Sequence, residues 1–192
     1  MNLKNKTKTA IAGLLIMAMC LAACAHKQKE NPYGPVVEKL GDEDAYAFLD
    51  MDYKNYVMVT SDGLYDTGTE SQGAIYCTVY YYGKDGAVNL GTIMSDGTAY
   101  PISFSGDGIF AASGHGIEKY AISEKDNQLY LKKAAYVAYD EDGNEHYTSV
   151  TDGKEMNSSE EEYEELAEEY RESQIIHFSY GADGCVNEII EY

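Results

Sequence analysis

A short acidic stretch near residue 140 contains the residue types that bind calcium. Asp140, Asp142 and Asn144 carry carboxyl or amide oxygens at alternate positions, as an EF-hand loop begins. The rest of that loop is missing, because Gly143 stands at its fourth position instead of its sixth and Thr151 replaces the bidentate glutamate. We therefore expect a solvated hairpin turn here, with Asp140, Asp142 and Asn144 as the calcium candidates.

Other residues with catalytic potential do not form a recognisable set. His115, His146 and His177 are far apart, and none begins a zinc-binding spacing. Ser113 lies in a glycine-rich segment without the strand-to-helix context of a nucleophile elbow. The 33 acidic residues offer many carboxylate pairs for glycoside hydrolysis, so none is singled out. We therefore assign no catalytic residue and no cofactor, and expect a binding role rather than an enzyme.

Tyrosine is the residue type best suited to recognition in this chain, which has 19 Tyr, four Phe and no Trp. Between residues 74 and 82, apolar residues alternate with Tyr76, Thr78, Tyr80 and Tyr82. A strand with this pattern has an aliphatic face, which we expect toward the core, and a phenolic face. Tyr76, Tyr80 and Tyr82 are thus the candidate recognition face; the alternative is that they pack under a helix or across neighbouring strands.

The elements that position these residues are mostly strands. Aromatic or β-branched runs separated by Asp-Gly and related turns predict strands over 45–51, 56–60, 74–82, 87–93, 99–104, 109–112, 117–123 and 129–139. We expect a mainly β fold with one helix, in which an antiparallel meander forms a twisted sheet or a partly closed barrel.

The predicted helix covers residues 159–172. Ser159 and Glu162 have the spacing of a capping box, and Tyr163, Leu166 and Tyr170 recur at helical spacing. An amphipathic helix of this kind should pack its apolar stripe on the sheet. Further strands are expected at 175–180 and 186–190.

The N-terminus has the layout of a secretory signal over 1–23, with Lys4, Lys6 and Lys8 before an apolar run. That run is shorter than the roughly 20 residues of a membrane-spanning helix. Its end, Leu21-Ala22-Ala23-Cys24, resembles the lipobox of bacterial lipoproteins. The resemblance implies cleavage before Cys24 and attachment of diacylglycerol, with palmitate-type chains, to its thiol. We expect a flexible tether over 24–35 and a single domain over 36–192.

The charge of the chain limits the kinds of partner that it can bind. The chain has 14 basic and 33 acidic residues, a net charge of −19, which disfavours nucleic acid and anionic lipid surfaces. The expected partners are the membrane, through diacylglycerol and an N-acyl chain on Cys24, and an envelope protein or glycan.

After the signal and anchor are set aside, Cys77 and Cys185 remain, either as a disulfide or as buried thiols.

The order of the segments along the chain resembles that in a family of small uncharacterised lipoproteins of clostridial gut bacteria. The resemblance rests on the anchored tether, the segment 45–52, the Tyr-rich meander, Gly114–Gly116, and the acidic helix followed by 175–180. Many of those relatives have an Asp-x-Asp-Gly-Asp-Gly loop where this chain has Asp50-Met51-Asp52-Tyr53-Lys54-Asn55. Lys54 replaces the third carboxylate and the glycines are absent, and both departures count against a calcium role at that loop.

These observations predict a bacterial lipoprotein on the outer side of the cell membrane, with a β-rich domain that binds or shields an envelope component. One alternative is a hydrolase of glycans or other envelope material that uses two carboxylates. Another is a structural surface protein stabilised by calcium.

Overall fold

The computed structural model describes residues 31–68, 72–83 and 86–180. The chain divides into two compact units, Met1–Asn31 and Pro32–Tyr192, and the described residues fall almost entirely in the second. Cys24 and the predicted recognition residues Leu21, Ala22 and Ala23 lie outside the described ranges. None of the described helices has both the length and the hydrophobicity that a bilayer crossing requires.

The first sheet has five antiparallel strands in the order β14-β1-β2-β5-β6. Its strands are β1 (Ala45–Leu49), β2 (Val57–Ser61), β5 (Tyr76–Gly83), β6 (Gly86–Met94) and the short β14 (Ser179–Tyr180). A separate two-stranded ribbon, β3 (Leu64–Asp66) and β4 (Gln72–Ala74), forms between β2 and β5 along the chain. The helix α2 (Gly34–Val37) precedes β1.

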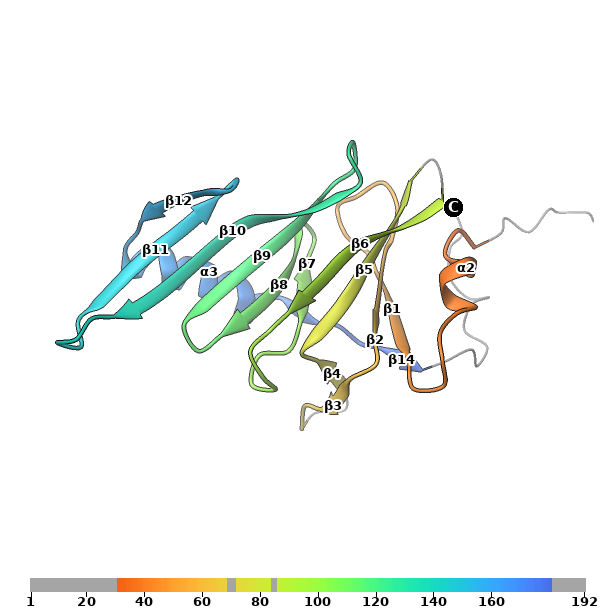
Figure 1. Cartoon of the computed structure of the whole chain (residues 1–192), viewed down its shortest axis with the longest axis horizontal. Helices are drawn as coiled ribbons and strands as arrows, with labels where there is room; N and C mark the ends of the chain where they lie inside the picture. The colour runs from red at the N-terminus through yellow and green to blue at the C-terminus, as the bar shows by residue number, and fades with distance from the viewer. Residues whose placement is uncertain (1–30, 69–71, 84–85, 181–192) are drawn as a thin grey trace, which may run out of the picture. The chain divides into compact units, whose positions relative to one another are not determined.

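The second sheet has seven antiparallel strands in the order β12-β11-β10-β9-β8-β7-β13. The six longer strands follow one another as hairpins: β7 (Ser103–Ser105), β8 (Gly108–Ser113), β9 (Gly116–Ser123), β10 (Gln128–Tyr139), β11 (Glu145–Thr151) and β12 (Lys154–Asn157). The chain then forms α3 (Glu160–Glu172) and returns to the opposite edge as β13 (Gln174–Ile175), beside β7. Figure 1 shows α3 lying behind β9 to β11.

The largest hydrophobic cluster joins the two sheets. The first sheet contributes Val57, Val59, Cys77 and Val79 among others, and the second contributes residues that include Ile109. On β5, Cys77, Val79 and Tyr81 are buried while the residues between them are half-buried, so the predicted aliphatic core face is confirmed.

The helix α3 forms as its sequence predicts and covers a second cluster. The Ser159 hydroxyl accepts a hydrogen bond from the Glu162 amide at 3.3 Å, which caps the first turn. Leu166 and Ala167 are buried against a group of sheet residues that includes Phe110. At the other end of the helix, the Tyr170 hydroxyl donates to the Pro101 carbonyl at 3.0 Å.

The fold is mainly β, as predicted, and the structure adds detail that the pattern lacked. The meander divides into two main sheets between β6 and β7, and neither closes on itself among the described strands. Residues 175–180, expected as one strand, instead give β13 and β14 in different sheets. The predicted strand 99–104 is reduced to β7, and β11 and β12 extend the sheet beyond the predicted strands. The predicted strand 186–190 is outside the described residues.

The folded part also begins earlier than residue 36. Tyr33 is completely buried, within a cluster that contains Val37, Tyr46 and Met58. Its hydroxyl donates to the Tyr56 carbonyl and accepts a hydrogen bond from the Tyr82 amide at 3.0 Å. Tyr33 thus fixes α2 to the outer face of the first sheet.

Candidate recognition groove on the five-stranded sheet

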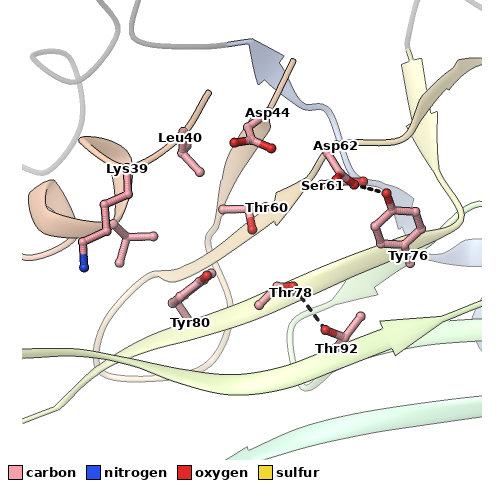
Figure 2. A pocket seen from close by; sticks show the side chains of 11 residues that line it. Lys39, Leu40, Asp44, Thr60, Ser61, Asp62, Tyr76, Thr78, Tyr80 and Thr92 are labelled. Atoms are coloured by element: carbon pink, nitrogen blue, oxygen red, sulfur yellow. Dashed lines mark hydrogen bonds between the residues drawn. The ribbon is translucent and has the colours of Figure 1, made fainter. Parts of the chain in front are cut away.

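The outer face of the first sheet holds an open groove of about 460 Å³. Strands β2, β5 and β6 form its floor, and α2 with the segment that leads to β1 forms a wall. Figure 2 shows the labelled side chains of both, with Asp44 and Asp62 near one rim. The floor residues are Thr60, Ser61, Asp62, Tyr76, Thr78, Tyr80 and Thr92, and the wall residues are Val36, Lys39, Leu40 and Asp44.

A row of three threonines crosses the floor. In the sheet register Thr60 pairs with Thr78, and Thr78 pairs with Thr92. The hydroxyl oxygens of Thr78 and Thr92 lie 3.2 Å apart, within hydrogen-bond distance. Because adjacent strands are about 4.8 Å apart, the row places three hydroxyl-bearing side chains across roughly 10 Å.

Two of the three predicted tyrosines border this row. Tyr76 and Tyr80 lie two residues before and after Thr78 on the same strand, so their side chains leave the same face of β5. Figure 2 shows the two rings on either side of Thr78. The third, Tyr82, lies outside the groove and packs edge-on against Tyr33, with ring centroids 6.4 Å apart.

The Tyr76 ring is held in place from two directions. Its hydroxyl donates a hydrogen bond to the Asp62 carboxylate. The ring also lies against Gly63, where an added Cβ would come within 2.9 Å of ring atoms. The glycine that follows Asp62 therefore allows the ring to approach the turn closely.

The calcium candidates form a hydrogen-bonded turn. One Asp140 carboxylate oxygen accepts from the amides of Asp142 and Asn144, at 2.9 and 2.8 Å. The other lies 2.9 Å from the Asn144 side-chain nitrogen and 3.1 Å from His146 Nε2. These bonds, first that from the Asn144 side chain, lower the pKa of Asp140. Among the residues that the structure describes, no three His, Cys, Asp or Glu side chains gather as a metal would require.

The remaining residues that were candidates from the sequence occupy positions with a structural role. Ser113 and His115 belong to the β8–β9 turn, in which the Ser113 hydroxyl donates to the Gly116 carbonyl at 3.3 Å. Cys77 is a free thiol, fully buried, and desolvation raises its pKa to about 12, so it behaves as a core residue. Its candidate partner Cys185 lies outside the described residues.

A buried lysine in the second sheet was not predicted from the sequence pattern. The Lys119 side chain is 5% exposed, and its ammonium nitrogen lies 2.6 Å from Asp107 and 2.8 Å from Glu169. It also lies 5.0 Å from the centre of the Phe110 ring. Lys132 makes a second contact to Asp107, and Lys133 a second contact to Glu169. We call Lys119, Lys132, Lys133, Asp107 and Glu169 the lysine network.

Pairs of a tyrosine hydroxyl and a carboxylate recur across the domain. The two oxygens of Glu118 accept from Tyr120 and Tyr136, each at 2.6 Å. Glu145 accepts in the same way from Tyr139 and Tyr147, at 3.2 and 2.5 Å. A phenol is a neutral donor, so it can satisfy a carboxylate in a chain that has far fewer bases than acids.

No protein-family model, curated protein or solved structure matches this chain.

Proposed function

We propose that this chain is a bacterial lipoprotein, attached to the outer side of the membrane through Cys24, whose β-rich domain binds an extracellular or envelope component without turnover. The observation that carries the binding role is the groove on β2, β5 and β6. It combines two tyrosine rings, a row of three threonines and two carboxylates on a rigid sheet. Rigid aromatic side chains give contact area at a low entropic cost, and hydroxyls add directional hydrogen bonds.

The anchor is supported by the lysine-led apolar run and by Leu21-Ala22-Ala23-Cys24. Two acyl chains suffice for stable attachment, whereas a single chain is marginal. We expect Cys24→Ala to abolish incorporation of radiolabelled or alkyne-tagged palmitate and to leave a precursor or a soluble product. Cys77→Ala, which removes a buried thiol, should still be labelled. Labelling that persists in Cys24→Ala would refute the anchor.

Binding in the groove can be tested before the ligand is known. A photoreactive p-benzoylphenylalanine at Thr92, which is exposed on the groove floor, should cross-link an envelope component when the whole chain is expressed on cells. The same group at Tyr139, which is 54% exposed on β10 of the other sheet, is the matched control. Equal cross-linking at the two positions, or none at Thr92, would contradict recognition by the groove.

A hydrolase is the second candidate, because Asp44 and Asp62 line the same groove. Two carboxylates facing one sugar are the basic requirement of glycoside hydrolysis. This alternative predicts release of reducing ends from an envelope glycan, and loss of that release in Asp44→Asn or Asp62→Asn. Turnover with this dependence would replace the binding role.

A further inference from the structure

We infer that the ligand of the groove is a neutral saccharide chain, with a sugar ring placed over Thr78 between Tyr76 and Tyr80. This inference rests on the proposed binding function and goes further by assigning the chemical class of the ligand.

The floor requires a ligand that both donates and accepts hydrogen bonds. A threonine hydroxyl carries one donor and two acceptor positions, and three such groups occur on neighbouring strands. The Thr78 and Thr92 hydroxyls share one hydrogen bond with each other, and an apolar ligand would cover their remaining donor and acceptor positions without satisfying them. A saccharide has hydroxyls that fill both roles along its edge.

The flanking rings add the apolar contact that a sugar face needs. Tyr76 and Tyr80 are four residues apart on β5, so at about 3.3 Å per residue their attachment points are separated by roughly 13 Å. Asp62 fixes the Tyr76 hydroxyl, while the Tyr80 ring packs partly on the Tyr33 cluster. Both rings are thus positioned before the ligand arrives, which lowers the entropic cost of binding.

The charge of the groove selects against anionic ligands. Among the described residues that line it, Asp44 and Asp62 occur with a single basic residue, Lys39, and the whole chain has a net charge of −19. A phosphate-rich or sulfated polymer would be repelled, whereas sugar hydroxyls can donate to these carboxylates. The groove volume of about 460 Å³ lies within the roughly 300–1,000 Å³ of small-molecule sites.

The test uses the full chain in detergent micelles and four probes in titration calorimetry. The saccharide probes are cellotetraose, maltotetraose and the tetramer of N-acetylglucosamine, and tetralysine represents a basic peptide. We expect at least one saccharide to bind, and Thr78→Val to weaken it about tenfold because that variant removes a hydroxyl at nearly constant volume. Tyr80→Ala should weaken it at least as much.

Two variants in the other sheet serve as controls. Thr148→Val on β11 and Tyr139→Ala on β10 repeat the chemical changes away from the groove and should leave saccharide affinity unchanged. Circular dichroism establishes that each variant is folded.

Three outcomes would overturn the inference, and each has a different meaning for the proposed function. Tetralysine binding that Thr78→Val abolishes, without saccharide binding, keeps recognition by the groove and rejects the saccharide. Saccharide binding that neither groove variant changes rejects the groove as its site. If no probe binds, the saccharide is rejected, and the cross-linking at Thr92 decides separately whether the groove recognises another ligand.

Discussion

At the scale of single residues, Lys119 is the least expected feature of the domain. Its aliphatic stem passes over Gly108, where a Cβ would come within 2.8 Å of the lysine Cγ, and its ammonium reaches two carboxylates. A buried ammonium is tolerated only when it is paired and hydrogen-bonded. Both conditions hold here, so burial of the Lys119 ammonium costs little folding free energy while its partners are present.

Removal of the Lys119 charge should therefore be costly. We expect Lys119→Ala to lower the free energy of unfolding by about 2–3 kcal/mol, because it breaks two contacts and leaves space against Phe110. Lys133→Ala, whose side chain is 45% exposed and contacts Glu169 alone within the network, should cost less than about 1 kcal/mol. Urea denaturation measures both, and equal losses would contradict the importance of burial.

At the scale of elements, the lysine network joins parts of the chain that are distant in sequence. Asp107 comes from the β7–β8 turn, Lys119 from β9, and Glu169 from α3. Burial raises the pKa of Asp107, but hydrogen bonds from Lys119, Lys132 and Ser105 outweigh this effect, and the net pKa lies well below 3.8. The pKa of Glu169 is lowered for the same reasons, with burial opposed by Lys119 and Lys133.

These shifts give the second sheet and its helix an acid-sensitive contact. Because the pKa of Asp107 is lower in the folded state, its contribution is complete above about pH 4 and is lost as the pH falls toward the folded-state pKa. Asp107→Asn should be less stable than the wild type at pH 6, and the difference should narrow steadily as the pH falls below about 4. Thermal unfolding across this range measures the difference, and parallel curves would argue against the ion pairs as its source.

The same elements show what the sequence could and could not predict. The alternation on β5 and the cap of α3 are local patterns, so they predicted a core face and a helix that the structure confirms. The strand β12 carries four exposed residues and has no apolar alternation, so periodicity missed it. Of the residues that line the groove, Tyr76 and Tyr80 were singled out from the sequence because they alternate along one strand. The threonine row depends on pairing between strands, and the lysine network depends on the packing of α3 and the β7–β8 turn against β9; no local pattern contains either.

At the scale of the whole molecule, tyrosine compensates for a shortage of basic residues. The chain has 19 tyrosines and 33 acidic residues, and phenol hydroxyls satisfy Glu118 and Glu145 twice each. Burial first, and then the hydrogen bond and charge of Glu118, raise the pKa of Tyr120 and Tyr136 above the ordinary value of 10. For Tyr170, burial raises the pKa to about 12.

This arrangement predicts a limit to stability at alkaline pH. These phenols have a higher pKa in the folded state than in the unfolded state. Their contribution to the stability of the folded state is therefore complete below pH 10 and is lost as the pH rises through the folded-state pKa values. Tyr136→Phe should lower the free energy of unfolding by about 1–2 kcal/mol at pH 8, and this difference from the wild type should shrink above pH 10. Urea denaturation at pH 8 to 11 measures it; a deficit independent of pH would assign the loss to packing.

The segment after α3 determines when the domain can finish folding. Its two short strands complete both sheets, since β13 pairs with β7 and β14 pairs with β1, close to the start of the described domain. Contacts between such distant positions form slowly, because the intervening chain must be brought together first. In the nascent polypeptide, β1 therefore lacks its partner on this edge until residues 179 and 180 have been synthesised. Until then the outer edge of β1 stays unpaired, and an unpaired strand edge is a place where two nascent chains can associate.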